Sequence, residues 1–250
     1  MYDAHHVLSL IDDHTLLVLL FGGLSFGCLF VYYGETARLG ARHRVAPMTL
    51  TAVAAFMPHD GNFVLNYRDW FDGYDHWLLK GFWLALVITT AMEGLFLSQI
   101  VRFGREEIAP HLSQPQFMGL CFGSIAGGIA LWAVLKANVD DPLYLTTFML
   151  TITWCLPSMT TLYLRRGVRR GISVRQVGAY WGMALGYILL TTIVLDFREA
   201  WWLVLCGVTL AWGAALGVLV ARAPDWEPAA AGSRPRLDGR GHGAVPSPLT

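Results

Sequence analysis

Two carboxyl groups lie inside long apolar stretches of this sequence, where an ionisable side chain is costly to insert and usually serves a function. Glu93 occurs in the run TTAMEGLFLSQ, and Asp60 occurs in FMPHDGNF. A carboxyl group in poorly hydrated, apolar surroundings tends to remain protonated near neutral pH, which is the state that a proton donor needs. We predict that Asp60 and Glu93 serve as a general acid or a proton relay. The alternative is a neutral carboxyl group that only hydrogen-bonds to a neighbouring helix.

The residues next to Asp60 can modify its chemistry. His59 and Asn62 flank Asp60 closely enough to orient it by hydrogen bonding. We therefore place His59 with the catalytic residues and Asn62 with the residues that contact substrate. Pro58 has no backbone N–H, so we expect a local break in the helix there.

Aromatic side chains in the apolar stretches are candidates for lining a substrate cavity, because aromatic faces stabilise cations such as a carbocation intermediate. Ordinary packing is the alternative for each of them. The candidates are Phe56, Phe63, Trp83, Trp132, Trp154, Tyr180, Trp181, Tyr187 and Trp212. Glu35 and Asp196 are secondary candidates, which solvated helix ends with nearby arginines would also explain.

Several familiar membrane chemistries do not fit the sequence. A retinal protein needs a lysine in its last apolar segment, and residues 200–220 contain none. Bis-histidine haem needs paired histidines, but His59 stands alone in these stretches. The acidic pairs that begin at Asp12 and Asp140 lack the third acid of a magnesium-binding DDxxD motif. We expect no metal, no cofactor and no nucleic-acid partner, and we interpret the four cysteines as packing thiols.

The composition places these residues in a membrane. The chain is 55% hydrophobic and 14% charged, with a mean hydropathy of +0.47, which is too apolar for a soluble domain of 250 residues. A bilayer crossing needs roughly 20 apolar residues. Segments near this length occur at residues 16–33, 45–64, 77–101, 117–136, 143–164, 177–195 and 200–220. We therefore predict an all-α, multi-pass protein of the cell membrane, with seven transmembrane helices within residues 1–222.

The charges between the segments predict the orientation. Arginines follow the first, third, fifth and seventh segments, whereas acidic residues occupy the other loops. Because basic loops remain on the cytoplasmic side, we expect the N-terminus outside and the C-terminus inside. Residues 223–250 are rich in Pro, Gly, Ala and Ser, which predicts a disordered cytoplasmic tail.

The depths of the two acids can be estimated from the helical rise. Glu93 lies about nine residues from Arg102, or roughly 13 Å above the inner end of its segment. Asp60 lies about 15 residues into residues 45–64, or roughly 22 Å above the inner end. The two depths therefore differ by roughly 9 Å.

A faint repeat offers a second interpretation. Cys28, Arg38, Gly40 and Arg42 match Cys155, Arg165, Gly167 and Arg169 at an offset of 127 residues. Related halves around a central helix occur in some transporters. Two cytoplasmic loops that merely share arginines would give the same matches.

The order of the seven segments, the loop LRRGVRRGIS and the run IVRFGREEI resemble a known family. Over residues 15–222 the chain is similar to the small integral-membrane terpene cyclases of fungal meroterpenoid and indole diterpenoid pathways. Bacterial relatives are implicated in drimentine-type alkaloid pathways. The resemblance implies that a membrane carboxylic acid protonates an alkene or epoxide and starts a cation cyclisation without loss of diphosphate.

The acids of that family are not at the same positions here. Its essential glutamate in the second helix corresponds to Met57, one turn before Asp60, and its aspartate in the seventh helix falls near Trp212. The resemblance therefore implies a rebuilt acid pair, with Asp60 as donor and Glu93 as partner or terminal base, or the reverse. The partners would be a lipophilic, isoprenoid-bearing small molecule and the lipid bilayer. The oligomeric state stays open, and a proton-coupled transporter or an assembly subunit is the alternative to an enzyme.

Overall fold

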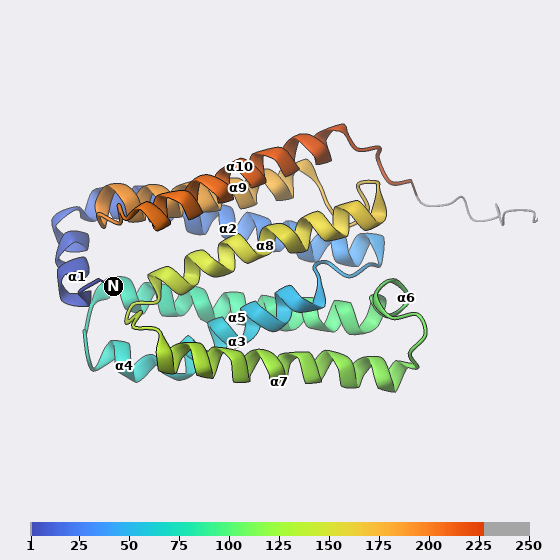
Figure 1. The fold of residues 1–250 in the computed structure, drawn as a ribbon, viewed down its shortest axis with the longest axis horizontal. Helices are drawn as coiled ribbons and strands as arrows, with labels where there is room; N and C mark the ends of the chain where they lie inside the picture. The colour runs from blue at the N-terminus through green and yellow to red at the C-terminus, as the bar shows by residue number, and fades with distance from the viewer. Residues whose placement is uncertain (1, 228–250) are drawn as a thin grey trace, which may run out of the picture.

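The computed structural model describes residues 2–227, and every regular element in that range is a helix (Figure 1). Each of the seven predicted apolar segments forms a helix, so the all-helical prediction is confirmed. These helices are α2 (Thr15–His43), α3 (Leu50–Leu65), α5 (Trp77–Phe103), α7 (Gln114–Asn138), α8 (Leu145–Arg166), α9 (Val174–Leu189) and α10 (Ala200–Arg222). A π-helical turn, η1 (Leu190–Val194), extends α9. The short helices are α1 (Ala4–Asp13), α4 (Tyr67–Phe71) and α6 (Arg105–Ile108).

Five helices in the described range are long and apolar enough to cross a membrane: α2, α5, α7, α9 with η1, and α10. Their outward faces carry large apolar side chains, such as Leu16, Leu131 and Val204, which are 79%, 55% and 65% exposed. An exposed apolar belt of this kind suits lipid rather than water. By contrast, α3 has only 16 residues, or roughly 24 Å of helix, which is shorter than a bilayer core.

The long helices form two layers (Figure 1). In one layer α9 packs between α2 and α10, and in the other α3 packs between α5 and α7. The two layers meet where α2 contacts α5, and α8 lies between them against α10 and α3. The core of the bundle therefore lies where α2, α3, α5, α8 and α9 face one another.

Helix α3 begins at Leu50, five residues later than the sequence pattern predicts. The Thr49 side chain accepts a hydrogen bond from the Ala52 N–H at 3.2 Å and so acts as the N-cap. Pro47 precedes it, and a residue before proline avoids the helical conformation. The predicted start at Val45 was therefore wrong because residues 45–49 form the connection to α2.

The predicted break at Pro58 was also wrong, because α3 runs through this residue as a continuous helix. Proline removes one hydrogen bond and leaves the carbonyl four residues earlier, that of Ala54, without its usual partner. Helix α7 approaches at this point through Gly128. The Trp132 indole N–H then donates to the neighbouring carbonyl of Ala55 at 2.6 Å. Contact with α7 thus compensates for the proline.

The two ends of the bundle differ in charge. The arginine-bearing ends of α2, α5, α8 and α10 lie together at the end near α6 (Figure 1). There Arg166 forms two hydrogen bonds with Glu107, each 2.8 Å long. Of the predicted tail, residues 223–227 are described, and Asp225 pairs with Arg169 at 2.8 Å. Residues 228–250 lie outside the described range.

Helix α1 closes the opposite, acidic end. The Tyr2 hydroxyl donates to Asp141 at 2.5 Å, and both burial and this carboxylate raise the pKa of Tyr2. Asp12 accepts hydrogen bonds from Trp77 and His76, each 3.0 Å long, which lower the pKa of the Asp12 carboxyl group. These contacts attach α1 to the start of α5 and to the segment that precedes α8.

Candidate functional site

The two predicted acids meet at one small cavity in the core. Asp60 from α3 and Glu93 from α5 both line this space, which has a volume of about 30 Å³. Such a volume holds one or two water molecules. Four aromatic rings complete much of its wall: Tyr32, Tyr33, Phe56 and Phe148.

The acids lie at similar depth because α3 begins late. Counted from Leu50, Asp60 is ten residues into its helix, or roughly 15 Å. Glu93 lies ten residues before the end of α5 at Phe103, which is the same distance on the same rise. The predicted difference of roughly 9 Å was therefore wrong, since it counted residues 45–49 as helix.

Glu93 has no solvent exposure and only one hydrogen bond among the described residues. The Tyr33 hydroxyl on α2 donates to Glu93 Oε1 at 2.6 Å, while Oε2 has no partner there. An ionised carboxylate in such surroundings needs several donors, because an unpaired buried charge is very costly. The contacts of Glu93 therefore suit a protonated carboxyl group whose Oε2 hydroxyl is free to act on a neighbouring molecule.

Asp60 is bound at both of its oxygens. His59 Nδ1 lies 2.8 Å from Oδ1, and the Thr89 hydroxyl donates to Oδ2. His59 is only 1% exposed, and its ring lies 4.6 Å from the ring of Trp132 between centroids. An aspartate with a histidine and a hydroxyl partner can exist as an ion pair or share a proton with the imidazole. Asp60 is thus better suited than Glu93 to accept and pass on a proton.

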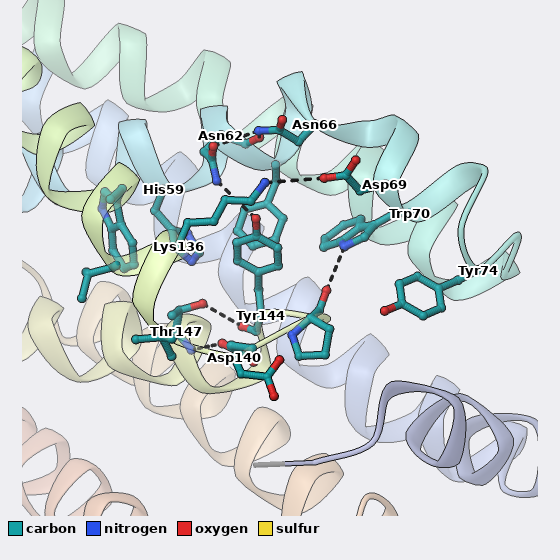
Figure 2. A pocket seen from close by; sticks show the side chains of 16 residues that line it. His59, Asn62, Asn66, Asp69, Trp70, Tyr74, Lys136, Asp140, Tyr144 and Thr147 are labelled. Carbon is teal, nitrogen blue, oxygen red and sulfur yellow. Dashed lines mark hydrogen bonds and ion pairs between the residues drawn. The ribbon is translucent and has the colours of Figure 1, made fainter.

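A polar vestibule of about 290 Å³ lies on the side of His59 that faces away from the inner cavity, at the acidic end of the bundle (Figure 2). Asn62 donates to the Tyr144 hydroxyl at 3.3 Å, and Lys136 lies 3.6 Å from Asp69. Figure 2 shows these side chains arranged around the space. His59 lines the vestibule and bonds to Asp60, which lines the inner cavity. His59 therefore connects the two spaces.

Two larger apolar pockets adjoin the inner cavity. One, of about 390 Å³, lies between α2 and α5, and it shares Phe148 with the cavity wall. The other, of about 730 Å³, lies between the α3–α7 pair and the α8–α10 pair, and it shares Thr151. Both volumes lie within the roughly 300–1,000 Å³ that is usual for small-molecule sites.

The predicted aromatic residues divide among these spaces. Phe56 lines the acid cavity, Phe63 lines the vestibule, and Tyr187 lines the pocket between α2 and α5. Trp132, Trp154 and Trp212 line the pocket between α7 and α8, where Trp154 is 52% exposed. Of the predicted aromatic residues, the structure therefore brings only Phe56 to the cavity with the two acids.

Three predicted aromatic residues bond to backbone carbonyls instead. Tyr180 donates to Ile152 at 2.9 Å, Trp181 to Leu210 at 3.1 Å and Trp83 to Val64 at 3.2 Å. None of the three lines the acid cavity or an apolar pocket described above. Their contacts are those of packing residues that join neighbouring helices.

The secondary acids lie at opposite ends of the bundle. Glu35 is held by Arg38 at 2.6 Å and by the Ser173 hydroxyl at 3.0 Å. Asp196 is exposed and lies 2.8 Å from Arg198. Neither lines the acid cavity.

Tyr32, Tyr33, Thr89 and Phe148 are residues of the site that the sequence interpretation missed. Thr89 lies four residues before Glu93, which places both on one face of α5. The spacing of four residues could therefore have identified Thr89 from the sequence. Nothing in the sequence indicates that Tyr33 of α2 faces Glu93, because this contact depends on how α2 is rotated in the bundle.

The structure was also searched for a metal site, and the chain was compared with known proteins. Within residues 2–227, no three His, Cys, Asp or Glu side chains are grouped as a metal ion would require. A comparison of the chain with protein-family models, curated proteins and solved structures found no match.

Proposed function

We propose that this protein is a membrane-bound terpene cyclase that protonates an alkene or epoxide of an isoprenoid-bearing substrate, such as a farnesylated indole. The proton adds to the alkene carbon or epoxide oxygen, and the resulting cation is attacked by further double bonds of the same chain. Loss of a proton from the last cation ends the reaction. The product is an isomer of the substrate, and no diphosphate leaves.

One observation carries the proposal: a fully buried carboxyl group with a free oxygen faces a cavity walled by aromatic rings. Glu93 supplies that oxygen, and Tyr33 holds the other one. A buried acid can protonate a weakly basic alkene because water does not compete for the proton. The rings of Tyr32, Phe56 and Phe148 then stabilise the cation.

The hydrogen bonds favour Glu93 as the proton donor and Asp60 as its partner. Asp60 has both oxygens engaged, by His59 and by Thr89, and offers neither freely to a substrate. Once Glu93 has given its proton away, the nearby Asp60 can supply another through the cavity. This assignment reverses the order that the sequence alone favours.

The substrate must widen the acid cavity, since about 30 Å³ is far too small for a farnesyl chain. Phe148 separates this cavity from the apolar pocket between α2 and α5. Rotation of the Phe148 ring would join the two spaces and let an apolar chain approach Glu93 from the lipid side.

We also propose seven crossings of the cell membrane, in which the short α3 and the less apolar α8 join the five long apolar helices. The arginine-rich end near α6 would be cytoplasmic, and α1 would lie outside. A short α3 is tolerated because α5 and α7 cover it on both sides.

The experiment is to incubate membranes that contain the protein with a farnesylated indole and with its terminal epoxide. We expect a cyclic isomer of one of them. Glu93→Gln and Asp60→Asn should each lower the rate by roughly 10²–10⁴-fold, the usual contribution of general acid catalysis. Asp196→Asn is the matched control and should keep the rate. Activity that survives both substitutions in the cavity would refute the mechanism.

A proton-coupled transporter is the second candidate, because proton-bearing groups extend from the vestibule to Glu93. A transporter must also open towards the other end of the bundle. Phe96 and Ile100, which follow Glu93 on α5, are fully buried there. Accessibility of a cysteine at Ile100 to a water-soluble thiol reagent, with no cyclic product, would favour transport.

A further inference from the structure

We infer that His59 is a proton relay that connects the outer vestibule to the Asp60–Glu93 pair. This role extends the proposed function and rests on it, because cyclisation is the reaction that would use the relayed proton. His59 does not touch the space next to Glu93, so it is a positioning and relay residue rather than the donor itself.

Among the described residues, the imidazole of His59 bonds through only one of its two nitrogens. Nδ1 is 2.8 Å from Asp60 Oδ1, whereas Nε2 is buried and has no partner among the described residues. A buried ring nitrogen without a partner is costly. A ring that served only to hold Asp60 would gain stability from a partner at Nε2, whereas a relay needs that nitrogen free for a proton from water.

His59 also lies where the two spaces approach each other. His59 lines a polar vestibule of about 290 Å³, and its hydrogen-bond partner Asp60 lines the inner cavity with Glu93. The rings of Phe63 and Trp132 also line the vestibule, and their centroids lie 4.9 Å and 4.6 Å from that of His59. Aromatic rings at this distance can stabilise a transient imidazolium ion.

Each proton that Glu93 gives to the substrate is replaced by one taken from vestibule water. Nε2 takes a proton from vestibule water and leaves hydroxide, while Nδ1 releases a proton to Asp60 Oδ1. Asp60 passes a proton to the spent Glu93 carboxylate across a cavity that has room for one or two waters. The proton lost by the last cation passes to Asp60 and from there to Nδ1, while Nε2 returns its proton to the hydroxide, which restores the starting tautomer of His59. The charged and titratable groups that line the two spaces next to His59 are Tyr32, Tyr33, Asp60, Glu93 and Cys155 on the inner side, and Asp69, Tyr74, Lys136, Asp140, Asp141 and Tyr144 around the vestibule.

The test follows hydrogen–deuterium exchange of the buried carboxyl group and needs no substrate. The purified protein in lipid is moved from H₂O to D₂O, and infrared spectroscopy follows the carboxylic C=O band that Glu93→Gln removes. We expect His59→Asn, which keeps a hydrogen-bond donor for Asp60, to slow the shift of this band roughly tenfold or more. His5→Gln, on the exposed face of α1, is the control and should exchange like wild type.

A second variant guards against a folding defect at His59. Asn66→Trp places a large ring in the vestibule and touches neither acid, and it should also slow the exchange. Exchange at the wild-type rate in both variants would overturn the relay, as would the absence of any carboxylic band that depends on Glu93. If only the relay is wrong, the protein will still form the cyclic product while exchange no longer depends on His59. If only the proposed function is wrong, no cyclic product will form while exchange still depends on His59.

Discussion

Gly128 on α7 is the position where the smallest side chain should do the most damage to the site. A Cβ atom there would lie 1.9 Å from the carbonyl oxygen of Ala54 and 3.0 Å from Cγ of Pro58. Real Cβ atoms essentially never approach other atoms within 3.0 Å. In Gly128→Ala, α3 and α7 must therefore separate by about 1 Å, because close-packed interiors leave no spare room.

The cost follows from the contacts that this separation disturbs. Overpacking of a core typically costs about 1–3 kcal/mol. The hydrogen bond from Trp132 to Ala55, 2.6 Å long and one turn further along α7, would lengthen or break, at a further cost of about 1 kcal/mol. The same shift moves His59 and Asp60 on α3, and a misplacement of about 1 Å can lower a rate by about 100-fold.

The assay is thermal unfolding of the purified protein in detergent, together with the rate of cyclisation in membranes. Gly123→Ala is the matched control, because a Cβ atom at Gly123 meets nothing within 4 Å. That variant should be as stable as wild type or more so, since alanine favours helix by about 1 kcal/mol over glycine. Equal melting temperatures for the two variants would refute the close contact between α3 and α7.

Three further predictions concern other parts of the bundle. Tyr33→Phe removes the hydrogen bond to Glu93 and keeps the ring, so cyclisation should slow while the melting temperature changes little. The control is Tyr163→Phe, which should leave the rate unchanged because the Tyr163 hydroxyl bonds to Leu219, far from the acids. Glu107→Gln removes the charge that faces the largely buried guanidinium of Arg166 and should destabilise the fold by about 1–3 kcal/mol, whereas Glu106→Gln, an exposed position, should not. Hydrogen bonds from Trp77 and His76 lower the pKa of Asp12, so the attachment of α1 is complete above the ordinary value of 3.8 and is lost as the pH falls below it. Digestion of α1 by pepsin should therefore accelerate below about pH 4, and Asp12→Asn should expose α1 to other proteases at neutral pH.

The helices and the two acids could be predicted from the sequence for one physical reason. Apolar runs of membrane length are rare in soluble proteins, and a carboxyl group within such a run is costly enough to stand out. Glu93 and Asp60 were found in this way, and the structure places both at one cavity. The spacing of four residues between Thr89 and Glu93 would also have identified Thr89 as part of the site, because residues four apart lie on one face of a helix.

The sequence could not show which face of each helix points inward. Trp154 and Trp212 lie in apolar segments, as Tyr33 does, yet only Tyr33 reaches the acids. In a helix with apolar residues on all sides, periodicity gives no direction, so the rotation is set by packing against neighbours. The late start of α3 was also hidden, because the five residues before it are nearly as apolar as the helix.

The most direct test of the central claim is the fate of the proton on Glu93. Membranes that contain the protein are incubated with the farnesylated indole or its epoxide in D₂O, and the product is examined by mass spectrometry and NMR. We predict a cyclic product made by wild type and by Asp196→Asn but not by Glu93→Gln. From the alkene substrate this product should carry deuterium at the carbon that is protonated first, whereas an epoxide takes the proton on oxygen, where it exchanges with solvent. A cyclic product of the alkene substrate without deuterium at that carbon, or a cyclic product of either substrate formed at the wild-type rate by Glu93→Gln, would contradict the account.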